Sequence, residues 1–207
     1  MRDRDLVRLY WPVELRPAFD ALFGIDDAMA DVVASSTQPA LGAIRLAWWR
    51  EALERLDVNP PPPEPRLQAA AAELLPRRIT GAMLAELESG WAALLDEKPD
   101  VSRITSHGVA LFEAAAKILT MDSDEALEGA AKFYGLVAAA RLGIISPLID
   151  YRGGLPFAGP VPKKLRPVTA LASLAWRDSL RIDELEPQAT PGRAWTLFKH
   201  RLTGRIR

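Results

Sequence analysis

Apolar residues recur along this chain at intervals of three and four, the spacing that places side chains on one face of an α-helix. The broadest apolar stripe lies in residues 17–33, and a second one follows in residues 41–56. Further helical patterns occupy residues 67–75, 80–95, 102–120, 126–145 and 167–179. No stretch alternates convincingly with a period of two, so the pattern predicts an all-α protein of about seven helices.

The chain contains 17 prolines, which interrupt the helical pattern in two places. Residues 59–65 read NPPPPEP, which excludes a helix because proline lacks an N–H group and fixes φ. We interpret them as a stiff linker between two half-buried helices. Residues 147–167 combine Gly153 and Gly154 with repeated prolines, which predicts a long irregular segment. The length of 207 residues suits one domain spanning residues 1–207.

The charge balance and the residue usage exclude several classes of function. With 26 Lys and Arg against 27 Asp and Glu, the chain lacks the overall positive charge that attracts nucleic acid. It has no cysteine, and His107 and His200 lie far apart in the sequence, so neither a thiolate metal site nor zinc hydrolase chemistry is expected.

The distribution of apolar residues bears on the location of the protein. No apolar run reaches the roughly 20 residues that span a bilayer, and the charged first residues show no signal-peptide pattern. We therefore expect a cytoplasmic protein without a transmembrane segment. We also expect the basic tail, residues 199–207, to make peripheral contact with a membrane surface or to contact an acidic partner.

Asp27 and Asp31 form the most suggestive cluster of polar residues. They lie four residues apart, which on a helix puts both carboxylates on one face, one turn apart. Paired carboxylates that face a cavity can hold magnesium ions, which in turn bind a diphosphate. A solvated acidic face is the alternative, and the spacing alone favours it.

Arg141 and the pair of adjacent tryptophans are the other unusual features. Arg141 lies among small residues in the 126–145 pattern, where a buried guanidinium without a partner is costly. Three alternatives remain open for it: it reaches solvent, pairs with an aspartate of the first helix, or binds a phosphate-like group. Trp48 and Trp49 point about 100° apart on a helix, so at most one of them faces the deepest core.

Several segments together resemble the squalene/phytoene synthase family. They are residues 18–25 (AFDALFGI), 41–53 (LGAIRLAWWREAL) and 153–157 (GGLPF), in that order. More narrowly, they are similar to a bacterial branch related to a mitochondrial complex I assembly factor. The resemblance covers nearly the whole chain and is loosest in residues 57–125. It implies the isoprenoid synthase-like fold, a helical bundle around a central apolar cavity, in a chain shorter than the active enzymes.

Active members of that family join two prenyl diphosphates head to head, using two aspartate-rich motifs that bind magnesium. The resemblance therefore implies that Asp27 and Asp31 are the candidates for binding a metal. It implies a diphosphate-binding role for the same two aspartates together with Arg45 and Arg141. No cofactor is expected for a non-catalytic relative, and magnesium is expected for an active one.

The sequence departs from the family pattern in both motifs. In the register set by residues 18–23, only Asp31 of the first motif is retained. The second motif is expected in residues 138–149, where Arg141 is kept, Leu142 replaces the carboxylate and Asp150 comes too late. A departing diphosphate would therefore lack part of the charge stabilisation that its transition state needs.

Three functions follow as hypotheses. The leading one is a non-catalytic protein, a pseudoenzyme of the family, that binds an isoprenoid or lipid or acts with a protein partner as a complex assembly factor. The alternative is an active magnesium-dependent prenyltransferase that condenses farnesyl or geranylgeranyl diphosphate. The third is a helical protein-interaction module in which the prolines of residues 60–65 bind another domain.

Overall fold

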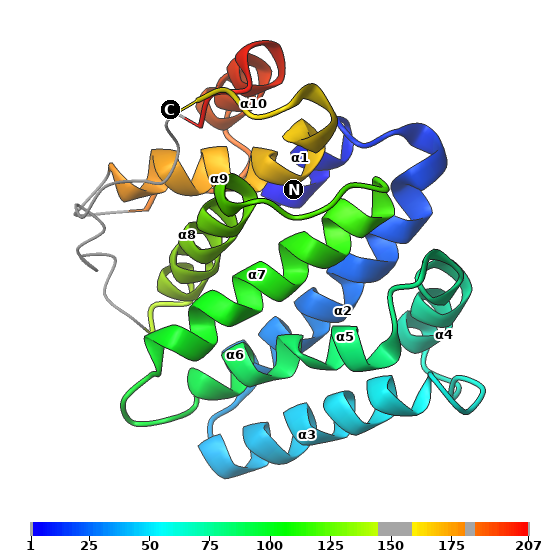
Figure 1. Ribbon diagram of the computed structural model, residues 1–207. Helices are drawn as coiled ribbons and strands as arrows, with labels where there is room; N and C mark the ends of the chain where they lie inside the picture. Colours follow the sequence, from blue (N-terminus) through cyan, green and yellow to red (C-terminus); the bar gives the residue numbers. More distant parts are fainter. Residues whose placement is uncertain (1, 145–158, 181–184, 207) are drawn as a thin grey trace.

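The protein is described by a computed structural model, which covers residues 2–144, 159–180 and 185–206 (Figure 1). Within these ranges it contains helices and no strand, so the all-α prediction is confirmed. The α-helices are α1 (Asp3–Arg8), α2 (Arg16–Ser35), α3 (Pro39–Arg55), α4 (Pro65–Glu73), α5 (Gly81–Ala85), α6 (Leu87–Ala93), α7 (Val101–Ile118), α8 (Glu125–Arg141), α9 (Arg166–Ser179) and α10 (Pro191–Thr203).

The expected number of about seven helices is wrong, because the described residues form ten α-helices. The pattern in residues 80–95 divides at Glu86, which is both the C-cap of α5 and the N-cap of α6. Helix α1 was not predicted at all. It has six residues, and a helix of that length is held by tertiary contacts rather than by its own propensity, so it leaves no periodic signal.

The long helices α2 and α7 run through the middle of the molecule (Figure 1). Helix α7 packs against α6 and α8, α8 packs against α9, and α9 packs against α10. In Figure 1, α3 lies along the lower edge, and α1 and α10 lie at the top. One connected apolar core runs from Val7 of α1 to Leu197 of α10. Because the core reaches the first and last described helices, both ends of the chain contribute to the same packing unit.

Each of the two proline-rich segments leads into a helix at its C-terminal end. Residues 56–64 separate α3 from α4, and Pro65 begins α4, where the Glu64 side chain accepts a hydrogen bond from the backbone N–H of Leu67 at 2.7 Å. Residues 145–158 lie outside the described part, and with them Asp150 and the Gly153–Gly154 pair. After Pro162 the chain forms a 3-10 turn, Lys163–Leu165, and continues into α9.

The two adjacent tryptophans divide between core and surface, as predicted. Trp49 is 8% exposed and joins the core, whereas Trp48 is 48% exposed on the outer face of α3. None of the helices in the described ranges is long and apolar enough to cross a membrane.

Glycines permit the close crossing of α7 and α8. A Cβ on Gly108 would overlap the backbone carbonyl of Ala131, and a Cβ on Gly135 would lie 2.7 Å from the carbonyl O of Ile104. Gly108 of α7 and Gly135 of α8 therefore allow the two helices to approach each other closely. This crossing holds the cavity-lining half of α8 in place.

We expect Gly108→Ala to destabilise the protein by about 1–3 kcal/mol, since the added methyl group must push α8 away from α7. Gly24 is the matched control, because it lies inside α2 with open space around the position of its Cβ. Gly24→Ala should instead stabilise by about 0.5–1 kcal/mol through the lost flexibility of the unfolded chain. Urea unfolding of both variants measures the two changes, and equal effects would contradict the close crossing.

Candidate functional site

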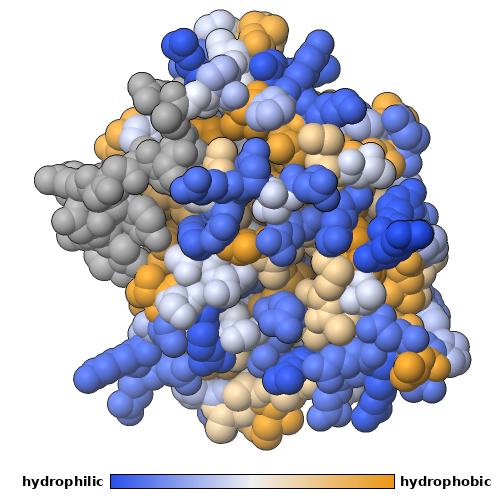
Figure 2. Space-filling model, viewed as in Figure 1, coloured by the Kyte–Doolittle hydropathy of each residue, from blue (hydrophilic) through white to orange (hydrophobic). Residues whose placement is uncertain are grey.

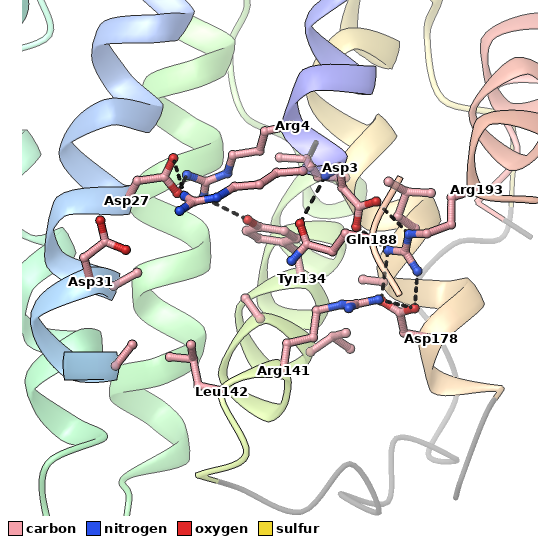
Figure 3. Close-up of a pocket in the computed structure, with 18 of the residues that line it drawn as sticks. Asp3, Arg4, Asp27, Asp31, Tyr134, Arg141, Leu142, Asp178, Gln188 and Arg193 are labelled. Atoms are coloured by element: carbon pink, nitrogen blue, oxygen red, sulfur yellow. Dashed lines mark hydrogen bonds and ion pairs between the residues drawn. The ribbon is translucent and has the colours of Figure 1, made fainter. Parts of the chain in front are cut away.

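A cavity of about 310 Å³ opens between α1, α2, α8 and α9 (Figure 3). Its lining contains Asp27 and Asp31 of α2 and Arg141 of α8, so three of the four sequence-predicted site residues meet there. Arg45 does not belong to the lining. It is exposed on α3, with its Nη1 atom 3.5 Å from the Ser35 hydroxyl. The binding roles of all four residues stay predictions.

The apolar part of the cavity wall follows from helical spacing. On α9, Leu171, Leu174, Ala175 and Asp178 repeat at intervals of three and four and face the cavity together. Helices α2 and α8 add mostly small side chains, which leave the space open; they are Ala30, Ala34, Val137 and Ala138. The cavity therefore combines an apolar floor with charged groups at its sides.

Asp26, the neighbour of Asp27, is fully buried and accepts hydrogen bonds from three other helices. Its partners are the guanidinium of Arg4 on α1, the indole N–H of Trp91 on α6 at 2.9 Å, and Nε2 of His107 on α7 at 2.6 Å. Burial alone would raise the pKa of this carboxyl, but Arg4 and His107 outweigh it and hold the pKa below its ordinary value. Asp26 is therefore ionised at neutral pH and is fully occupied by these donors.

Arg4 forms ion pairs with both Asp26 and Asp27. One amino group of its guanidinium pairs with Asp26, and the other pairs with Asp27. The same side chain donates to the backbone carbonyl of Phe23 and to the Tyr134 hydroxyl, both at 3.1 Å. Figure 3 shows Arg4 reaching from α1 towards Asp27 of α2 above Tyr134. Helix α1 thus supplies an internal cation to Asp27, one of the two candidate metal ligands.

Asp27 is less buried than Asp26 and has a second cationic neighbour. Arg2 lies 3.6 Å from its other carboxylate oxygen. Burial raises the pKa of Asp27, and Arg4 opposes that rise. Asp31, one turn further along α2, is exposed at the cavity, and its carboxylate forms no hydrogen bond or ion pair with the described residues. Of the two predicted metal ligands, only Asp31 therefore has a free carboxylate.

A second charged cluster, which we call the Arg193 cluster, lies on the other side of the cavity. It consists of Asp3, Arg141, Asp178 and Arg193 (Figure 3). Arg193 of α10 donates to both carboxylate oxygens of Asp3, at 2.6 and 2.7 Å, and also pairs with Asp178. Arg141 donates from Nε to Asp178 at 2.8 Å and from Nη2 to the carbonyl of Glu186 at 3.1 Å. Of the alternatives for Arg141, pairing with an aspartate of the first predicted helix, residues 17–33, is wrong, because its partner is Asp178 of α9.

The carboxylates at the cavity do not fit a magnesium site. A magnesium ion needs free carboxylate oxygens, and it would have to compete with Arg4 for Asp26 and Asp27. In the described ranges, no group of three or more His, Cys, Asp or Glu side chains is arranged to hold a metal ion. Apart from Asp31, these aspartates therefore already have their counter-ions in the arginines of the chain itself.

Sequence reasoning missed Asp3, Arg4, Tyr134, Asp178 and Arg193, all of which line the cavity. Two of them had a readable signal. Asp178 extends the apolar stripe of α9 by one more turn, and Arg193 begins the stripe that Thr196, Leu197 and His200 continue on α10. A charged residue in register with a buried stripe indicates a buried ion pair. Arg4 gave no such signal, because α1 is too short to show a period.

Neither the protein-family models nor the curated proteins nor the solved structures that we compared with this chain contain a match. The resemblance to squalene/phytoene synthases therefore stays a prediction from the residues that carry it.

We expect Asp26→Asn to destabilise the protein by about 3–5 kcal/mol at neutral pH, because it removes the charge that Arg4 and His107 share. Since the folded pKa of Asp26 is lowered, its contribution is complete above the pKa of an unfolded aspartate, about 3.9, and is lost as the pH falls below it. The difference in the free energy of unfolding between wild type and Asp26→Asn, measured by urea unfolding, should therefore become smaller below pH 4.

Asp20→Asn is the matched control, because Asp20 pairs with Arg8 at 2.8 Å on the surface. Solvent screens such a pair, so little change is expected at any pH. A similar loss of stability in both variants would contradict the role assigned to Asp26. So would a loss of stability in Asp26→Asn that stays constant down to pH 2.

Proposed function

We propose that the chain is a non-catalytic protein of squalene/phytoene synthase-like architecture that binds one small, mainly apolar ligand, such as an isoprenoid or a lipid tail. It would then work as a binding or assembly factor rather than as a prenyltransferase. The observation that carries this proposal is the ion pairing of Arg4 with Asp26 and Asp27. It neutralises Asp27, one of the two carboxylates that a magnesium–diphosphate complex would need, and leaves Asp31 as the other.

The Arg193 cluster supports the same conclusion from the other side of the cavity. Arg141 and Arg193 are the cations there that a diphosphate would bind, and both are paired with Asp178. Binding a diphosphate would break buried ion pairs and leave Asp178 facing the anion, which costs several kcal/mol. Each arginine in the described lining of the cavity is therefore paired with an aspartate rather than free for a phosphate group.

The size and the lining of the cavity support an apolar ligand. A volume of about 310 Å³ is at the lower end of the roughly 300–1,000 Å³ usual for ligand pockets. That space suits one small ligand better than two prenyl diphosphates. The apolar side chains that would contact it are Ala30, Ala34, Val137, Ala138, Leu142, Leu171, Leu174 and Ala175.

Farnesol is a suitable probe, because it carries an isoprenoid chain without a diphosphate. We expect it to bind, and we expect Ala138→Phe to weaken binding by about tenfold or more, the equivalent of roughly 1.4 kcal/mol, because the ring fills the cavity. Ala126→Phe is the matched control on the exposed first turn of α8 and should bind normally. Ala34→Phe repeats the test from α2 and guards against a folding defect in Ala138→Phe. Titration calorimetry gives the affinities.

Magnesium separates this proposal from the active-enzyme alternative. Adding magnesium should leave the affinity for farnesol unchanged, and incubation with farnesyl or geranylgeranyl diphosphate and magnesium should yield no head-to-head product. A product whose formation is abolished by both Asp27→Asn and Asp31→Asn would establish the prenyltransferase instead. If Ala138→Phe and Ala34→Phe both bind farnesol as the wild type does, the ligand lies outside the cavity and the proposal is overturned.

A further inference from the structure

The outer face of α10 carries an exposed apolar stripe. Trp195, Phe198 and Leu202 are 59%, 46% and 63% exposed, and their spacing of three and four places them on one side of the helix. The rings of Trp195 and Phe198 stack with their centroids 5.4 Å apart. The opposite side of α10 is buried, with Arg193 and His200 among the residues that face the core. Large apolar residues on a solvent-facing helix side usually mark an interaction surface.

Basic residues surround this stripe. Lys199 lies within it, and Arg201 and Arg205 follow near the end of the helix. Lys163 and Lys164 belong to the 3-10 turn before α9, which is brought next to the end of α10 by the hydrogen bond from Val161 N–H to the Gly204 carbonyl at 2.9 Å. We call these five basic residues together with Trp195, Phe198 and Leu202 the α10 surface.

The backbone fixes the basic turn beside the helix end. Gly204 ends α10 in the left-handed conformation, with φ of 71°, and a Cβ at this position would lie 2.6 Å from the Val161 carbonyl. Arg166 donates to the carbonyls of Arg201 and Leu202, at 2.8 and 3.1 Å. These contacts hold the turn that carries Lys163 and Lys164 beside the end of the helix that carries the apolar stripe.

The sequence on either side of these basic residues contains no acidic residue. Residues 159–177 and 187–206 contain no Asp or Glu. Within the part of the chain that the structure describes, none of the five basic residues of the α10 surface takes part in an ion pair with a carboxylate. In Figure 2, hydrophobic and strongly hydrophilic atoms lie side by side at the top of the molecule, where Figure 1 shows α10.

Helix α3 provides an internal comparison. Leu41, Ile44 and Trp48 form a similar stripe there, 55%, 66% and 48% exposed. The charges on α3 are mixed, however, because Arg50 pairs with Glu54 and Arg55 pairs with Glu51. Apolar exposure is therefore common to both helices, while the unbalanced positive charge belongs to the α10 surface.

We propose that the α10 surface docks the protein onto an anionic membrane, with α10 lying in the plane of the interface. Trp195, Phe198 and Leu202 then enter the boundary between headgroups and acyl chains, where tryptophan is favoured. The five basic residues lie beside the lipid phosphates and attract the negative surface. This docking is independent of the cavity and of whatever ligand it holds.

Vesicle co-sedimentation tests the proposal directly. The full chain should sediment with vesicles of phosphatidylcholine and phosphatidylglycerol, and much less with phosphatidylcholine alone. Replacing Lys163, Lys164 or Lys199 by Gln should weaken partitioning by about fivefold for each lysine. Raised salt should weaken it further, because it screens the surface charge. The double variant Phe198→Ser and Leu202→Ser should weaken it by about tenfold or more.

The double variant Leu41→Ser and Ile44→Ser on α3 is the matched control and should bind as the wild type does. Equal losses from the α3 and α10 variants, equal binding to both kinds of vesicle, or no binding by the wild type would overturn the proposal. A second copy of the chain is the competing occupant. Sedimentation velocity without lipid detects it, and a dimer that only the α10 variants dissociate would also overturn membrane docking.

Discussion

The buried carboxylate of Asp26 is the group around which the helices of this protein are arranged. It lies on α2 and accepts hydrogen bonds from Arg4 of α1, Trp91 of α6 and His107 of α7. A charge removed from water is tolerated only when its acceptor sites are filled, so each of these helices must present its donor at the right position. The indole ring of Trp91 also lies 4.7 Å from the imidazole of His107, which ties hydrogen bonding to packing at the same point.

This requirement also determines what the cavity can do. The donor that completes the shell of Asp26 is Arg4, and its second amino group reaches Asp27 at the cavity wall. A side chain needed for stability therefore occupies a carboxylate that metal chemistry would need free. The Arg193 cluster repeats the arrangement on the far side, where Asp178 is shared by two arginines. Within the described residues, the same ion pairs that hold α1 and α10 against the bundle leave the charges of the cavity lining nearly balanced, which supports the proposed apolar ligand.

Much of the fold could be read from the sequence, because the long helices bury continuous stripes such as the one on α2. Helix α1 could not, since its six residues are held by Asp3 and Arg4 reaching across the molecule to partners far along the chain. The candidate site was found in part. Asp27 and Asp31 share a face by local geometry alone, whereas the pairing of Arg141 with Asp178 depends on how α8 and α9 pack. Arg45 lies exposed on α3 and outside the lining of the cavity, and its binding role stays a prediction.

The orientation of α10 follows from the same buried charges. Turning this helix by half a turn would bury Trp195, Phe198 and Leu202, which the hydrophobic effect alone favours. The rotation would also withdraw Arg193 from Asp3 and Asp178, which would leave Asp3 without its cation and Asp178 with Arg141 alone. Breaking a buried ion pair costs about 3–5 kcal/mol, while a buried Leu or Phe gains about 1.5–3 kcal/mol at full burial. The Arg193 cluster can therefore offset the burial of part of the stripe, and it contributes to the orientation in which the aromatic side chains face outwards.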